Sequence, residues 1–111
     1  MKYQVKITVV KREYYQDLAD RFLVNPQVGP CRIFQEGQQF LVTQENYDNF
    51  PYETNFCKAA WDVIKIKVYA ALQGGRFYWE GWHKDNKQQI LCCDDGVRPV
   101  VFLLERSTVE E

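Results

Sequence analysis

The strongest constraint on the fold of this chain is a pair of apolar runs that flank the dipeptide Asp95-Gly96. Asp-Gly between apolar runs is the strongest short-range signal of a β-hairpin, because a type I′ turn needs a positive φ at both central residues. A two-residue turn within residues 89–106 would place Cys93 opposite Arg98. Both faces of that hairpin would be apolar, so the sequence predicts that it is covered on both sides.

Two further segments have a clear hydrophobic period. Residues 3–10 alternate between apolar and polar side chains and predict a half-buried strand. In residues 57–74 the apolar side chains recur with helical spacing, which predicts a long helix with an N-cap at Asn55 and an end at the glycine pair 74–75. Residues 63–69 also alternate and are rich in β-branched side chains, so a strand is the alternative there. The longer apolar stripe favours the helix.

Together these segments predict a single domain over residues 1–111 with an α+β fold. A mainly antiparallel sheet would pack against the long helix and against a short helix at about 14–23. The less regular parts are expected to contribute two short strands, at 32–35 and 39–43, joined by a turn at Glu36-Gly37. Residues 44–53 are expected to be irregular, and the acidic tail after Ser107 is expected to fray.

Composition excludes several classes of partner. The net charge is −1, which lacks the basic footprint that nucleic-acid binding normally needs. No apolar run is long enough to predict a membrane span, and the alternating N-terminus contains Lys2 and Lys6, unlike a signal peptide. We therefore expect a cytoplasmic protein whose cysteines are reduced thiols or ligands rather than disulfides.

The sequence also argues against two common kinds of enzyme. Ser107 is the only serine and lies near the C-terminus, so a Ser-His-Asp hydrolase is not expected. No glycine-rich phosphate loop is present. His83 is the only histidine, and a lone histidine in an aromatic segment is more often a surface or packing residue than a base.

The four cysteines are the main candidates for chemistry. They are Cys31, Cys57, Cys92 and Cys93, and none has the Cys-x-x-Cys spacing of zinc ribbons and thioredoxins. Neighbouring residues on a strand point to opposite faces, so Cys92 is predicted to face the core and Cys93 a different environment. All four could simply be small buried hydrophobic residues.

Three of the cysteines lie at the ends of predicted elements, where sites are usually built. Cys57 begins a helix, Cys31 follows a rigid Gly-Pro turn, and Cys93 lies opposite Arg98, a cation that favours a thiolate. We expect these three to converge on one pocket. Three thiolates would suit a soft metal such as zinc, copper or iron. Asp94 and Asp95 could join as ligands or as a base, although turn formation is their more common role.

Short motifs along nearly the whole chain resemble those of a small prokaryotic family described as an "uncharacterised repeat protein". The motifs are Gly29-Pro30-Cys31, the segment from Gly37 to Phe40, Cys57 to Trp61, and the hairpin from Cys93 to Val100. Many members carry proline where this chain has Arg32. The resemblance implies a shared pattern that includes Cys31, Cys57, Cys93, Asp95, Gly96, Arg98 and Pro99. It implies no activity.

Three functions remain open from the sequence. The first is a binding module with a site for a metal ion or a small molecule, built from Cys31, Cys57, Cys93, Asp95 and Arg98. The second is a structural or interaction domain with the cysteines in its core. The third is a thiol-dependent redox enzyme that uses Cys57. A second apolar stripe on the long helix and the two-sided hairpin also predict a homodimer.

Overall fold

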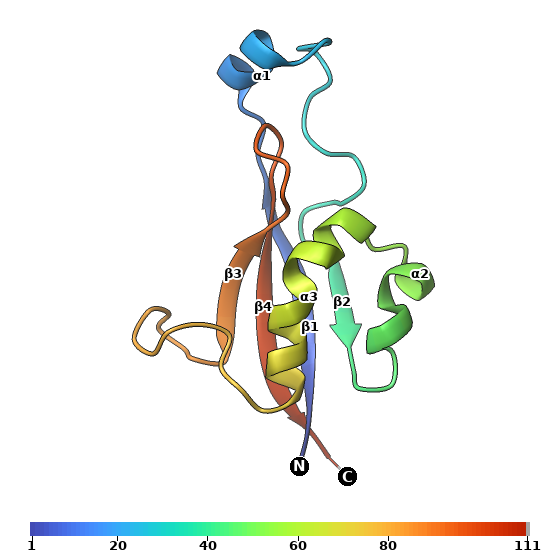
Figure 1. Ribbon diagram of the computed structural model, residues 1–111, viewed down its shortest axis with the longest axis vertical. Coiled ribbons are helices and arrows are strands. Elements are labelled where there is room, and N and C mark those ends of the chain that lie inside the picture. The colour runs from blue at the N-terminus through green and yellow to red at the C-terminus, as the bar shows by residue number, and fades with distance from the viewer. Residues whose placement is uncertain (111) are drawn as a thin grey trace.

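The computed structural model describes residues 1–110 and contains a four-stranded antiparallel sheet with the order β2-β1-β4-β3. The strands are β1 (Lys2–Arg12), β2 (Gln39–Val42), β3 (Gln88–Cys92) and β4 (Val100–Val109). The long helix α3 (Lys58–Leu72) lies on one face of the sheet, mainly over β1, as Figure 1 shows. The predicted α+β class and the predicted packing of the sheet against the long helix are confirmed, whereas α1 (Gln16–Phe22) lies beyond the end of the sheet and does not cover its face.

The central strands β1 and β4 pair from Lys2 opposite Val109 to Arg12 opposite Val100. Val5, Ile7 and Val9 are fully buried, as their alternation predicts. The pairing continues to Val109, so the prediction that the tail frays after Ser107 is wrong for the described residues. Backbone pairing in the middle of a sheet orders even a polar segment.

The helix α3 resolves the ambiguity of residues 63–69 in favour of the helix. Its buried side chains are Ala60, Trp61, Ile64, Val68, Ala71 and Leu72. This is the predicted stripe, and the helix ends before Gly74, which adopts a positive φ of 84°. The N-cap is Cys57 rather than Asn55, because Asn55 has a φ of 59° and ends the preceding helix.

A cluster of aromatic rings fills the space between α3 and the sheet. Phe102 of β4 lies 5.3 Å from Phe34 and 5.4 Å from Phe56, measured between ring centroids. Phe50 lies 4.7 Å from Trp61. Edge-on and tilted contacts of this kind add to the stabilisation that burial of the rings provides. The cluster joins the loops before and after β2 to the same core.

The hairpin forms, but not with the predicted turn. Leu91 pairs with Phe102 and Cys92 with Val101, so residues 93–99 form a longer loop. Gly96 has no positive φ, which excludes a type I′ turn. The loop is held instead by the side chain of Asp95, described below, and by its contacts with the chain before the short helix.

Two other local predictions need correction. Residues 32–35 form no strand, and β2 pairs with β1 instead of closing a hairpin at Gly37. Residues expected to be irregular contain the short helices η1 (Tyr47–Asn49) and α2 (Phe50–Thr54), because Phe50 and Pro51 are buried in the core. The first helix, α1 (Gln16–Phe22), forms within the predicted range of 14–23.

The face of the sheet opposite α3 is uncovered by the described residues. Ile90 is 45% exposed and Leu41 is 47% exposed on this face, so the prediction of a hairpin covered on both sides is wrong for the single chain. At the edge strand β3, the backbone N–H of Ile90 donates a 3.1 Å hydrogen bond to Nε2 of His83.

No helix in residues 1–110 combines the length and the apolar character needed to cross a bilayer.

Candidate functional site

The predicted site residues gather at one end of the sheet. The hairpin loop 93–99, the segment between α1 and β2, and the first turn of α3 meet at this end (Figure 1). Two backbone hydrogen bonds fix the hairpin loop to the chain before α1. Glu13 N donates to Pro99 O at 3.0 Å, and Tyr15 N donates to Val97 O at 2.8 Å. The main chain therefore determines where the loop lies.

One cavity of about 160 Å³ at this end is lined by Cys31, Cys57 and Cys93, and we call it the cysteine pocket. Asp95 and Arg98 also line it, so the structure brings together all five residues that the sequence singled out. The remaining lining residues are Ile33, Phe34, Ala59, Ala60, Asp94 and Val100. The pocket thus combines apolar walls with three thiols, two carboxylates and one cation.

Each thiol reaches the pocket from a different element. Cys31 is buried, and its carbonyl oxygen accepts a 2.7 Å hydrogen bond from Nη1 of Arg12. Cys57 is half-buried at the start of α3. Cys93 is also half-buried, and its Sγ accepts a 3.3 Å hydrogen bond from the backbone N–H of Val100.

Cys92 does not point into the core as predicted. It lies on the other face of β3, as alternation requires, but that face is exposed. The error arose because the sequence suggested that both faces of the hairpin were covered. Cys92 consequently provides an exposed thiol, within the same molecule, that lies outside the cysteine pocket.

Asp95 and Arg98 form an ion pair inside the hairpin loop. Nε of Arg98 donates to Oδ2 of Asp95 at 3.1 Å, while Oδ1 of Asp95 accepts the backbone N–H groups of Val97 at 3.0 Å and Arg98 at 3.1 Å. Burial raises the pKa of the Asp95 carboxyl, but these hydrogen bonds and the charge of Arg98 outweigh it and leave the pKa below its ordinary value. Asp95 is therefore both a turn former and the group that orients Arg98.

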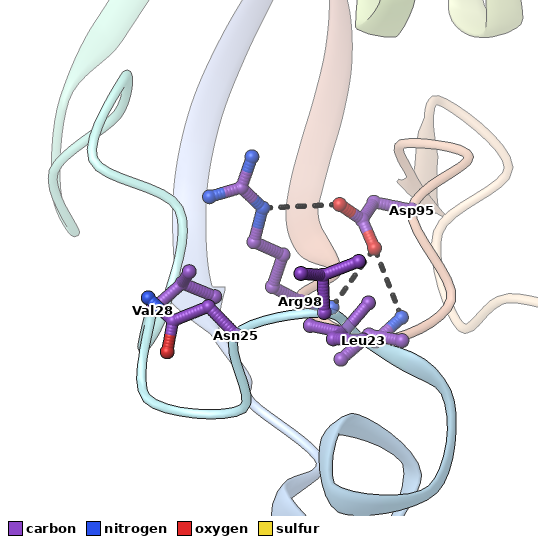
Figure 2. A pocket seen from close by; sticks show the side chains of 7 residues that line it. Leu23, Asn25, Val28, Asp95 and Arg98 are labelled. Atoms are coloured by element: carbon purple, nitrogen blue, oxygen red, sulfur yellow. Dashed lines mark hydrogen bonds and ion pairs between the residues drawn. The ribbon is translucent and has the colours of Figure 1, made fainter.

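Two open hollows adjoin the cysteine pocket and share Arg98 with it. The Leu23 hollow, drawn in Figure 2, has a volume of about 300 Å³ and is lined by Leu23, Val24, Asn25, Val28, Asp95, Val97 and Arg98. The Arg32 hollow has a volume of about 390 Å³ and is lined by Asn25, Gln27, Val28, Cys31, Arg32, Ile33 and Arg98. Arg98 thus lies at the junction of three concave surfaces.

Apart from Cys31, the contribution of residues 23–33 to the site was not predicted from the sequence. The only available signal was the pair of proline turns, at Asn25-Pro26 and Gly29-Pro30, which indicated a constrained segment without indicating its place in the fold. Tyr14 Oη donates to the carbonyl oxygen of Pro26 at 2.7 Å and holds this segment against the start of α1.

The described residues do not form a metal centre. In residues 1–110, no three or more His, Cys, Asp or Glu side chains are grouped so that they could hold a metal ion. Cys31, Cys57 and Cys93 line one cavity without adopting the arrangement of a ligand set. The expectation of a zinc, copper or iron site at these thiols is therefore not supported by their geometry.

Comparisons with protein-family models, with curated proteins and with solved structures found no match.

Proposed function

We propose that this chain is a small binding module whose cysteine pocket receives a small organic molecule. The observation that carries this proposal is the gathering of three thiols, from the segment before β2, the start of α3 and the end of β3, around one cavity. Small-molecule sites are mostly apolar hollows with a few polar groups that orient the ligand. The cysteine pocket has this composition, with Asp95 and Arg98 as the orienting groups.

The resemblance drawn from the sequence is consistent with this proposal. Of the shared pattern, Cys31, Cys57, Cys93, Asp95 and Arg98 line the cysteine pocket. We propose on this basis that the chain is a member of the family with these motifs. Its four free cysteines also suit a reducing compartment such as the cytoplasm.

The proposal is tested by alkylation of the native protein with iodoacetamide, followed cysteine by cysteine with peptide mass spectrometry. We expect Cys57 and Cys93 to react in the native state at rates that do not depend on low concentrations of urea, because the reagent enters an open pocket. If the cysteines only fill the core, they would react through unfolding, and their rates would rise steeply with urea. Cys92 serves as the exposed reference.

A variant that fills the pocket gives a matched control. Ala59 is exposed at the rim of the cysteine pocket, so Ala59→Leu should slow the alkylation of Cys57 and Cys93 and leave Cys92 unchanged. Val63→Leu, on the same helix but outside the pocket, should change none of the rates. Equal effects of both variants would contradict the proposal.

The pocket supports binding better than thiol catalysis by Cys57. His83 binds the backbone of Ile90 and is not among the residues that line the cysteine pocket, so the pocket has no imidazole to act as a base. The carboxylate of Asp95 is already engaged by Arg98 and two backbone N–H groups. For these reasons we do not propose an enzyme.

We also propose that the uncovered face of the sheet pairs with a second copy of this chain. Ile90 and Leu41 are exposed on this face, and Lys6 lies 3.6 Å from Glu105 between them. A twofold axis through such a face would bring Lys6 of each copy near Glu105 of the other. The face is thus apolar and self-complementary in charge, which suits a symmetric dimer.

A further inference from the structure

We propose that the ligand of this site is a small carboxylate, held by Arg98 and Arg32, with its apolar body in the cysteine pocket. This inference rests on the proposed binding function and adds the chemical class of the ligand. It begins from the position of Arg98, which lines the cysteine pocket, the Leu23 hollow and the Arg32 hollow. A ligand in any of the three lies beside the same arginine.

The guanidinium group of Arg98 has only part of its hydrogen-bonding capacity in use. Its Nε donates to Asp95 at 3.1 Å, whereas Nη1 and Nη2 make no hydrogen bond within residues 1–110. Figure 2 shows both terminal nitrogens on the side of the group turned away from Asp95. Because Asp95 is itself held by two backbone N–H groups, the free edge of the guanidinium group has a fixed direction. Such an edge matches the two oxygens of a carboxylate.

The charges around the Arg32 hollow favour an anion. Arg32 and Arg98 both line it, and no carboxylate does. Arg32 forms no ion pair within the described part of the chain. The side chains of Asn25 and Gln27 add amide donors to the same hollow. Arg32, together with the free Nη edge of Arg98, whose Nε pairs with Asp95, would attract a negatively charged group to this position.

The cysteine pocket beside it accommodates a different part of the ligand. Cys31, Ile33 and Arg98 line both the Arg32 hollow and the cysteine pocket, so the two lie next to each other. The buried side chains Phe34 and Val100 also line the pocket, and so do the two aspartates, Asp94 and Asp95. Asp94 and Asp95 repel an oxyanion that lies away from the arginines, whereas they do not repel an aliphatic body. The ligand is therefore oriented with its charge at the arginines and its apolar end among the thiols.

The first test compares two alkylating reagents of similar size, iodoacetate and iodoacetamide, which differ in charge. In both reactions a thiolate attacks the carbon that carries iodine, a C–S bond forms and iodide leaves. The relevant ratio is the rate with iodoacetate divided by the rate with iodoacetamide at one cysteine. It does not depend on how far the thiol is ionised, because both reagents react with the same thiolate. We expect this ratio at Cys57 and Cys93 to exceed that at Cys92 by about three- to fivefold. The ratio in denatured protein gives the intrinsic value for each thiol.

Two variants assign the preference to the arginines. Arg98→Gln should reduce the ratio at Cys57 and Cys93 to that of Cys92 while these thiols still react with iodoacetamide. Arg32→Gln should reduce it in part, and this variant breaks no hydrogen bond of the described structure, so it remains informative if Arg98→Gln fails to fold. A ratio that equals that of Cys92 in the wild-type protein would overturn the carboxylate assignment. Continued labelling by iodoacetamide would in that case leave the binding pocket itself intact.

A second measurement needs no reactive thiol. The ¹⁵N-labelled protein is titrated with hexanoate, with its neutral counterpart hexanamide, and with inorganic phosphate. We expect hexanoate to shift the amide resonances of Arg32, Arg98 and Val100, and hexanamide to shift them at least several-fold less. Shifts of equal size with hexanoate and hexanamide would show that charge plays no part. Stronger shifts with inorganic phosphate than with hexanoate would show that the site prefers a phosphate and would refute the stated ligand class.

Discussion

At the scale of single residues, the side chain of Asp95 organises the hairpin loop. A type I′ turn would have used Asp95 and Gly96 for their backbone freedom, but the structure uses the carboxylate of Asp95 as an acceptor for three N–H groups. This arrangement ties the conformation of the loop to the direction of Arg98. One residue thereby determines both a turn and the cation that faces the proposed ligand.

Asp95→Asn should lower the free energy of unfolding at neutral pH and change it little in acid. The pKa of Asp95 lies below its ordinary value of 3.8, so the ionised carboxylate stabilises the folded state above that value and loses this contribution as the pH falls through the folded-state pKa. The loss at about pH 7 should stay below about 1 kcal/mol, because the carboxylate is 40% exposed. Urea unfolding at about pH 7 and about pH 2 would measure the difference.

Asp94→Asn provides the control for this experiment. It removes the same charge from the neighbouring residue, which makes no hydrogen bond or ion pair through its side chain in the described structure. It should change the free energy of unfolding by less than about 0.5 kcal/mol at either pH. A gap between wild type and Asp95→Asn that widens in acid would contradict the assigned role of Asp95.

At the scale of elements, the register of the hairpin explains an outcome of the sequence analysis. The predicted turn was wrong, but the two strands still place their side chains on the predicted faces. Leu91 pairs with Phe102 rather than with Val100, a shift of two residues. Side chains alternate with a period of two, so an even shift leaves every residue on its predicted face. A shift of one residue would instead have placed Phe102 in solvent and Leu103 in the core.

The helix α3 offers a matched pair of isoleucines. Ile64 is fully buried against the sheet, and Ile66 is 70% exposed two residues later. Ile64→Ala should lower the free energy of unfolding by about 2–5 kcal/mol, and Ile66→Ala should change it by less than about 0.5 kcal/mol. Urea denaturation of the two variants checks both values.

The pair also tests the helix itself. If residues 63–69 formed a strand, Ile64 and Ile66 would lie on the same face, because they are two positions apart. Losses of similar size in the two variants would therefore contradict the helical assignment. Circular dichroism of both variants before unfolding shows whether each retains the native helix content.

At the scale of the whole molecule, a single layer of helix covers only one face of the sheet. The molecule is a thin body with principal extents of 50 × 34 × 21 Å. This leaves two apolar surfaces on opposite sides, one around Ile90 on the sheet and one around Ile66 on α3. Exposed apolar surface of this kind is a common mark of an interface.

We expect the mass measured by sedimentation equilibrium to rise with concentration from the 13.2 kDa of one chain towards twice that value. Ile90→Lys should prevent this rise, because it places a charge on the uncovered face of the sheet. Ile66→Lys should not, because it changes the opposite side. A mass of one chain at every concentration would refute the dimer, and an effect of Ile66→Lys alone would move the interface to α3.

The sequence by itself determined the elements whose periods are long and regular. The alternation of residues 3–10 and the helical stripe of residues 57–74 specify which side chains are buried, and such patterns depend only on local geometry. The placement of Cys31, Cys57 and Cys93 at element ends also indicated that these residues would line one pocket, since chain reversals bring element ends to the margins of a sheet. These inferences needed no knowledge of distant contacts.

Only the tertiary structure decided what depends on contacts between distant segments. The hairpin loop takes its form because Glu13 and Tyr15 bind its backbone, and β2 pairs with β1 instead of with residues 32–35. The segment 23–33 completes the site because hydrogen bonds hold it against α1. Cys92 is exposed because no second layer within residues 1–110 covers its face of the sheet. Which strands pair and which face of the sheet is covered depend on the path of the whole chain, and local sequence patterns do not encode that path.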